Sequence, residues 1–251
     1  MIGLVRNEWK KVFLPVLLTT VLLAIAMGVL SCTIYQNYVL HYDLEAWEVG
    51  TELFSLLYPL FVVVPLCWNL YYERKNNFLL YVMPRVKIKK YLTAKWIAYA
   101  LGTLCIIVIP YILSAVFALY VKPPVVPFVE NPFSHIFENA FIKTPLLYAV
   151  ALSLWRGTVS LFVMTFGFIL ALYCKNIFVI LTGPFMYSIL ENFVLAILRL
   201  ERLRLVVAFD PTTVNPEVVS IFSFFFGPIV LSIVIGLTAF LLSKKNAVVT
   251  I

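Results

Sequence analysis

The sequence predicts an all-α membrane protein with six transmembrane helices, and three observations lead to this expectation. The chain is 63% hydrophobic and only 12% charged, with a mean hydropathy of +1.00, whereas soluble domains are about half apolar and about a quarter charged. Six long apolar runs fill most of the chain, each close to the about 20 residues that a membrane helix needs. Little polar sequence remains between them. We therefore expect a single transmembrane domain over residues 1–251 that uses lipid as its solvent.

The six expected spans lie at residues 14–35, 50–72, 96–120, 146–174, 176–198 and 221–243. The fourth and fifth runs are nearly continuous, and together they are too long for one helix to cross a bilayer. A short hairpin turn is therefore expected at Cys174, Lys175 and Asn176, where the apolar sequence is interrupted.

Lys and Arg are unevenly divided between the two sides of the expected membrane, and the side richer in these residues faces the cytoplasm. The richer side carries Arg6, Lys10, Lys11, Arg74, Lys75, Arg85, Lys87, Lys89, Lys90, Lys95, Lys175, Lys244 and Lys245. The poorer side carries Lys122, Lys143, Arg199, Arg202 and Arg204. This distribution predicts a multi-pass protein with both termini in the cytoplasm. It also explains the net charge of +7, so a nucleic-acid partner is not expected.

The first 13 residues have an amphipathic pattern. Apolar side chains (Leu4, Val5, Trp9, Val12, Phe13) are interleaved with basic ones (Arg6, Lys10, Lys11). This pattern predicts a short helix lying at the membrane interface. Two alternatives are a basic flank that only sets the orientation and a signal peptide cleaved near Ala26. The apolar run continues to Leu30, which is longer than a usual signal core and favours an uncleaved first span.

The chain lacks the sequence motifs of several common metal-binding, catalytic and ATP-binding sites. The four cysteines stand singly in different spans or span ends and are interpreted as small apolar core residues (Cys32, Cys67, Cys105, Cys174). His41 and His135 lie in different external loops and form no H-E-x-x-H motif, so a metal site is not expected. No G-x-x-x-x-G-K-[ST] loop is present, so any ATP-driven work requires another chain.

The loop after the second span is the most informative polar segment. It has a charged start, an apolar stretch at 78–83, Pro84 and then a basic stretch. Proline disfavours helix at the residue before it, so a short helix is expected to end at Met83. A short apolar helix in a loop must lie on the membrane or dock into a partner protein. The alternative is an interfacial basic loop that binds anionic headgroups.

This loop resembles the coupling-helix region of type-2 ABC exporter permeases, the membrane subunits of ATP-driven exporters. In that family an acidic residue ends the second span, followed by a hydrophobic stretch, a proline, a basic residue and a lysine that opens the third span. The matching residues here are Glu73, Phe78, Leu79, Leu80, Tyr81, Val82, Met83, Pro84, Lys87 and Lys95. The N-terminal basic segment with Trp9 is similar to the family's elbow helix. The chain departs from the family at Lys75 and Asn76, where Gly-Thr is common.

The resemblance implies a permease subunit of the cell (inner) membrane that is not itself an enzyme. Two copies, or this chain and a paralogue, would face each other, and separate ATPase subunits would bind ATP and Mg. The residues that match the coupling helix would contact the ATPase. The aromatic content of 16% suits a hydrophobic or amphipathic substrate. The resemblance, rather than the composition, implies an antimicrobial or toxic peptide or a lipid. The alternatives are a membrane-embedded enzyme and a non-catalytic assembly or sensor protein.

Two ionisable residues interrupt the apolar runs, and such residues are costly in lipid. Arg156 and Glu191 are expected at similar depths in the outer part of the fourth and fifth spans. We expect them to pair or to share a polar cavity. The alternatives are that Arg156 only extends to the outer headgroups or that it contacts a substrate directly. The matched dipeptides Gly183-Pro184 and Gly227-Pro228 are candidate hinges.

Two external segments are long. Residues 121–145 contain five prolines among Phe and Val, which predicts a stiff, extended cover. Residues 199–220 begin with a basic stretch. They occupy the place where the resembled family has short external re-entrant helices. A surface helix without a special role is the alternative for this second segment.

Overall fold

The computed structural model describes residues 1–82, 84–125 and 135–245. The long helices are α1 (Ile2–Thr33), α2 (Glu45–Lys75), α4 (Ile88–Tyr120), α6 (Pro145–Tyr173), α7 (Ile177–Ile197) and α9 (Ile221–Lys245). The short elements are α3 (Phe78–Val82), α5 (Glu138–Lys143), α8 (Leu205–Phe209) and the 3-10 turns η1 (Ile34–Asn37), η2 (Glu201–Leu203), η3 (Pro211–Thr213) and η4 (Pro216–Val218). Within the described residues, six helices are long and apolar enough to cross a membrane. The protein is therefore an all-α, multi-pass membrane protein, as predicted.

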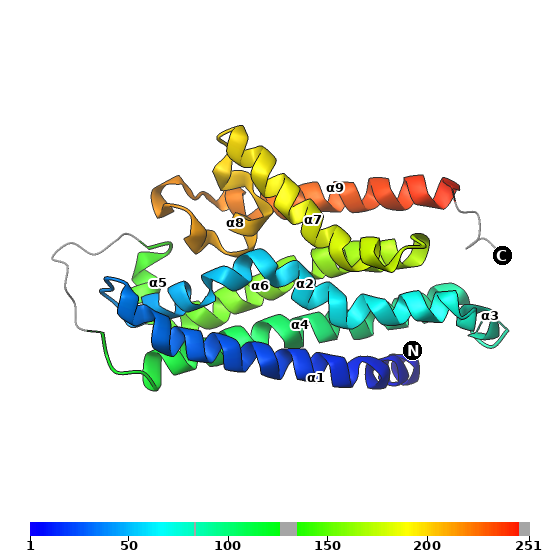
Figure 1. Ribbon diagram of the computed structural model, residues 1–251, viewed down its shortest axis with the longest axis horizontal. Helices are drawn as coiled ribbons and strands as arrows, with labels where there is room; N and C mark the ends of the chain where they lie inside the picture. The colour runs from blue at the N-terminus through cyan, green and yellow to red at the C-terminus, as the bar shows by residue number, and fades with distance from the viewer. Residues whose placement is uncertain (83, 126–134, 246–251) are drawn as a thin grey trace.

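The long helices run along the long axis of the molecule (Figure 1). The first residues of α1, the helix α3 and the last described residues of α9 lie at one end, which we call the α3 end. The turn η1 and the helix α5 lie at the opposite end, which we call the α5 end. The two ends of the described chain are thus on the same side of the bundle, which follows from an even number of crossings.

The helix α2 forms the centre of the bundle. It packs against α1, α4, α6 and α7, and its residues Tyr58, Val62, Val63 and Leu66 are almost completely buried. By contrast, α7 and α9 expose most of their apolar surface. Exposed apolar helix faces are stable in lipid but not in water, so these two helices suit the periphery of a membrane bundle.

The N-terminal segment differs from its prediction. The expected separate interfacial helix over residues 1–13 is not formed, because α1 continues unbroken from Ile2 through Pro15 to Thr33. Val12 is buried, and Glu8 pairs with Lys95 of α4 at 3.0 Å. These contacts hold the first turns of α1 in line with the rest of the helix along α4.

The predicted hairpin turn between the fourth and fifth spans is confirmed. The helix α6 ends at Tyr173 and α7 begins at Ile177. The side chain of Asn176 accepts a hydrogen bond from the Phe178 N–H at 2.9 Å, which caps the start of α7. Arg74 at the end of α2 donates to the carbonyl oxygen of Cys174, so α2 is tied to this turn.

The predicted hinge residues lie inside continuous helices. Pro184 is within α7 and Pro228 is within α9. A Cβ atom added to Gly227 would lie 2.7 Å from the Leu205 Cα atom, so this glycine allows close approach of α8 and α9. A Cβ atom added to Gly183 would lie 2.8 Å from a Leu170 side chain. These glycines therefore have packing roles, and their action as hinges stays a prediction.

The contact between α1 and α2 depends on a second close approach. A Cβ atom added to Gly50 would lie 2.6 Å from the Ser31 Cα atom, closer than two carbon atoms can approach. Because the conflict is with backbone, we expect Gly50→Ala to lower the free energy of unfolding by about 1–3 kcal/mol. The measurement is the midpoint of unfolding in detergent.

A matched control for this substitution is Gly236→Ala, which also lies inside a long helix. An added Cβ atom there meets nothing within 4 Å. The control is expected to be neutral or to stabilise the helix by up to about 1 kcal/mol, since alanine is the better helix former. Equal stability of the Gly50 variant and the parent would show that α1 and α2 do not approach closely at Ser31.

Candidate functional site

The short helix predicted in the loop after the second span is present as α3. It begins at Phe78, directly after Asn77, whose φ of 57° is one that asparagine tolerates better than most residues. Leu80 is 58% exposed and Tyr81 is 73% exposed, so α3 presents apolar surface outward at the α3 end. Leu79 and Val82 are half-buried, and Pro84 and Lys87 are exposed. Met83 lies outside the described residues.

A network of charges lies directly beneath α3. We call it the α3-end charge cluster, and its members are Glu8, Lys11, Glu73, Tyr91 and Lys95. Lys95 Nζ lies 2.5 Å from Glu73 Oε2 and 3.0 Å from Glu8 Oε2. Lys11 Nζ lies 2.6 Å from Glu8 Oε1 and 3.0 Å from Glu73 Oε1. The Tyr91 hydroxyl donates to Glu73 Oε2 at 2.9 Å.

The cluster is buried and electrically balanced. The Lys95 side chain is fully buried, and those of Glu8 and Glu73 are nearly so. Two carboxylates face two ammonium groups, and each carboxylate oxygen has a partner, which is the condition under which buried charges are tolerated. Because its members come from α1, α2 and α4, the cluster ties these three helices together at the α3 end.

The cluster is also connected to α3 itself. Lys11 Nζ lies over the Phe78 ring, 5.1 Å from its centroid, a distance at which a cation is attracted to an aromatic face. A displacement of α3 would therefore act on Lys11 and through it on the cluster. Sequence reasoning identified Glu73 and Lys95 but missed Glu8. Glu8 could have been noticed in the sequence, because it is the only acidic residue before Asp43.

An apolar groove runs along the bundle beside this cluster. It has a volume of about 750 Å³ and is open to the surroundings. Its walls come from α1, α2 and α7 and include Leu18, Phe61, Trp68 and Leu181. The groove is shaped and lined to accept an apolar surface or molecule.

A second buried ion pair lies toward the α5 end. Arg156 of α6 and Asp210, which follows α8, are both completely buried, and Arg156 Nη2 lies 2.6 Å from Asp210 Oδ1. Asp210 also accepts hydrogen bonds from the hydroxyl groups of Ser55 and Thr212. Burial by itself raises the pKa of Asp210, but Arg156 and these hydrogen bonds outweigh it and hold the pKa below its usual value.

Aromatic rings complete the environment of Arg156. Its Cζ atom lies 4.4 Å from the ring centroid of Tyr111 and 4.7 Å from that of Trp47. Phe209 of α8 lies farther away, at 5.9 Å. Flat aromatic faces stabilise a guanidinium group that water cannot reach. The ion pair and the rings together hold the segment around Asp210 inside the bundle.

These contacts change the expectation for Arg156 and Glu191. Arg156 pairs with Asp210, and the Glu191 carboxylate instead accepts the backbone N–H of Leu205 at 3.0 Å. Among the described residues, no ion pair joins Arg156 to Glu191. The alternative in which Arg156 extends to the headgroups is also incorrect, because its side chain is fully buried in protein.

Sequence reasoning missed Asp210 because it placed residues 199–220 outside the membrane bundle. In the structure, all five residues of α8 are buried, so this segment folds back into the protein. A signal was present in the sequence. The run Leu205–Phe209 is wholly apolar and ends directly at an acidic residue, which is unusual for a solvated loop.

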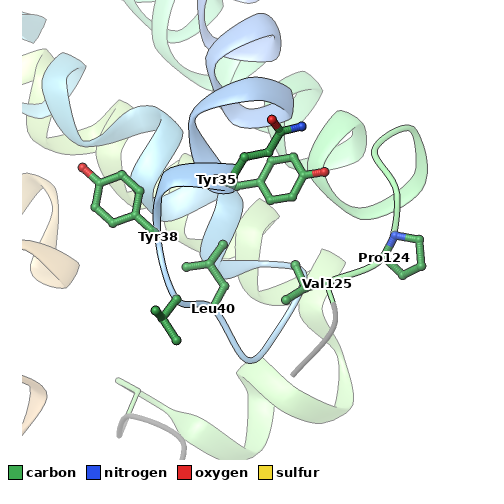
Figure 2. Close-up of a pocket in the computed structure, with 7 residues that line it drawn as sticks. Tyr35, Tyr38, Leu40, Pro124 and Val125 are labelled. Atoms are coloured by element: carbon green, nitrogen blue, oxygen red, sulfur yellow. The ribbon is translucent and has the colours of Figure 1, made fainter. Parts of the chain in front are cut away.

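A separate pocket lies at the α5 end, between the residues that follow α1 and those that follow α4. It has a volume of about 460 Å³. Figure 2 shows Tyr35, Tyr38 and Leu40 on one side and Pro124 and Val125 on the other. No charged side chain is among the described residues that line it. The pocket can hold a small apolar group.

Neither a metal centre nor a known relative defines the site. In the described part of the chain, no group of three or more His, Cys, Asp or Glu side chains is arranged to hold a metal ion. Comparisons with protein-family models, with curated proteins and with solved structures find no match for this chain. Function must therefore be argued from the residues and their geometry.

Proposed function

We propose that this protein is the permease subunit of an ATP-driven exporter of the type-2 ABC class. The observation that supports this proposal best is α3 together with the charge cluster beneath it. A short helix with an exposed apolar face projects from the end of a membrane bundle, where it needs a partner protein or a lipid surface. The cluster connects this helix to three long helices.

In this proposal a separate ATPase subunit binds ATP and Mg and docks on α3. Closure of the ATPase displaces α3, and Lys11 and Glu73 pass the displacement to α1, α2 and α4. A buried charge cluster is suited to this task, because its members cannot separate without exposing an unpaired charge to a low-dielectric interior. The three helices therefore move together.

The apolar groove supports the choice of substrate. A second copy of this chain, or a paralogue, would face the groove between α1 and α7 and convert it into an enclosed path. Leu18, Phe61, Trp68 and Leu181 would then line that path. Such a surface favours a hydrophobic or amphipathic substrate, for example an antimicrobial or toxic peptide or a lipid.

The first test is co-purification of the ATPase subunit. We expect a C-terminally tagged chain, solubilised gently from native membranes, to elute with ATPase activity. The double variant Leu80→Asp/Tyr81→Asp places two carboxylates on the exposed face of α3. It is expected to reduce the co-eluting activity by about tenfold or more, since charged residues are disfavoured in the centre of a protein interface.

The matched control is Tyr38→Asp/Val39→Asp, which changes two equally exposed apolar residues at the α5 end. This control should retain the full ATPase activity in the eluate. An equal loss in both variants would indicate general damage to the bundle. If the unaltered chain elutes without any nucleotide-hydrolysing partner, the exporter proposal fails and the enzyme and sensor alternatives gain support.

A further inference from the structure

A histidine lies between two carboxylates at the α5 end. His135, three residues before α5, has its Nε2 atom 2.9 Å from Glu45 Oε1 and its Nδ1 atom 3.7 Å from Glu48 Oε2. The three side chains are 10%, 7% and 14% exposed, in that order. The imidazole ring stacks on Phe141 of α5, with centroids 3.9 Å apart and an interplanar angle of 7°. The ring therefore fastens the α5 segment to the first turn of α2.

The Nε2 edge of His135 is at hydrogen-bond distance from Glu45, whereas its Nδ1 edge, 3.7 Å from Glu48 Oε2, is at ion-pair distance only. Neutral imidazole has one N–H donor and one nitrogen lone pair. Whichever nitrogen carries the hydrogen, the other directs its lone pair toward a carboxylate. Favourable contacts at both edges of His135 need one more proton, held either by the ring or by Glu48. Glu45 is already an acceptor on its other oxygen, which receives the N–H groups of His41 and Tyr42.

We propose that His135, Glu45 and Glu48 form a proton-binding site that holds α5 against α2. With the extra proton bound, both edges of the ring attract the carboxylates and α5 is docked. When that proton leaves, a lone pair faces a carboxylate and the contact weakens. The docking is therefore strong while this proton is bound and weakens as the pH rises and the site releases it. This inference does not depend on the proposed exporter function.

The surroundings of the site are consistent with this direction. Arg156 and Asp210 are the next charges that act on Glu48, and they largely cancel each other because they form an ion pair. The remaining neighbours are rings that carry no fixed charge. Tyr42 packs edge-on to His135, and Tyr148 of α6 packs against Phe141. On α5 itself, Glu138 and Lys143 are both exposed and of opposite sign.

His41 is the other titratable group nearby. Its ring packs edge-on to Tyr42, at 4.7 Å between centroids. It approaches Glu45 through its backbone N–H.

Hydrogen–deuterium exchange of α5 tests the proposal. The purified protein is labelled at about pH 6 and about pH 8.5, on either side of the imidazole range, with labelling times scaled to the intrinsic exchange rate. Protection of the 138–143 amides is expected to fall by about tenfold at the higher pH, as for a typical coupling between two equilibria. Protection within α4 reports whether the fold is intact.

Two variants make the test specific. Glu48→Gln supplies an amide N–H₂ that donates to His135 without an added proton, so its α5 protection should be the same at both pH values. His135→Gln removes the ring that shares this proton with Glu48, so its pH dependence should be clearly smaller than that of the parent. The matched control Glu52→Gln removes the same charge from an exposed position on α2, and it should behave like the parent.

The proposal has clear contrary outcomes. Equal α5 protection at both pH values in the parent would overturn it. So would a pH dependence in Glu48→Gln or His135→Gln as large as that of the parent. Because protection of α4 is read in the same experiment, a variant that fails to fold is recognised directly, and the other variant then decides the result.

Discussion

Replacing Asp210 with alanine is expected to destabilise the folded protein by about 3–5 kcal/mol, because removal of one member of a buried ion pair leaves the other charge uncompensated. Arg156 and Asp210 are both completely buried, 2.6 Å apart, and aromatic rings surround the guanidinium group. Without Asp210, the described structure offers Arg156 no other carboxylate within ion-pair distance. The measurement is the midpoint of denaturant-induced unfolding in detergent.

A double variant separates loss of the pair from loss of packing. Arg156→Met/Asp210→Leu replaces both charges with apolar groups, and it is expected to be more stable than either single variant. The control is Glu201→Ala, an exposed carboxylate whose half-buried partner Arg204 is 3.2 Å away, and its effect should be below about 1 kcal/mol. If the effects of the two single substitutions simply add in the double variant, Arg156 and Asp210 are not coupled as the structure shows.

The same pair has a signature in the pH dependence of stability. The pKa of Asp210 is held below its ordinary value in the folded protein. A carboxyl group with a lowered pKa contributes stability above its unfolded pKa, about 4, and loses that contribution as the pH falls through its folded pKa. The parent should therefore lose more stability between neutral and acidic pH than Arg156→Met/Asp210→Leu, which lacks the titrating group.

Replacing Lys95 with methionine is the second substitution with a large expected effect. Lys95 is fully buried and contacts both Glu8 and Glu73. Methionine has nearly the same volume but no charge, so Lys11 alone would face two carboxylates. Lys11 is 34% exposed and cannot compensate both. We expect a loss of about 3 kcal/mol in the free energy of unfolding, measured as for Asp210.

The control for this substitution is Lys90→Met, which removes an exposed lysine from the same end of α4. Its effect should lie within about 0.5 kcal/mol of zero, as for most surface substitutions. A variant that also removes one of the facing carboxylates, Lys95→Met/Glu8→Gln, should recover part of the lost stability because it restores the charge balance. Failure to recover any stability would contradict the proposed balance of the α3-end charge cluster.

The sequence was sufficient for the features that depend on local hydrophobicity. The six spans, the hairpin turn at Lys175 and the short helix that ends before Pro84 follow from apolar run length and from the conformational limits of proline. The structure describes each of them, although α1 begins at Ile2 and α4 at Ile88, well before the expected starts of the first and third spans. Glu73 and Lys95 were also identified, through the resemblance to the coupling region of type-2 ABC exporter permeases.

The partners of the buried charges were decided only by the tertiary structure. Arg156 was expected to pair with Glu191 or to share a polar cavity with it, but its ion-pair partner is Asp210. Glu8 was not singled out from the sequence, but it lies between Lys11 and Lys95. Both outcomes depend on segments that the hydropathy pattern places outside the bundle. The residues before Leu14 instead extend α1, and α8 folds back into the interior.

The physical reason is that span formation depends on neighbouring residues in the chain, whereas the pairing of buried charges depends on residues far apart in the sequence. Transfer of an apolar run into lipid depends on the residues of that run alone, so it can be read from the chain. A buried charge is stable only when an opposite charge reaches it within a few ångströms. Which charge reaches it is set by the packing of helices far apart in the sequence, and here that packing joins residues 8 with 95 and 156 with 210.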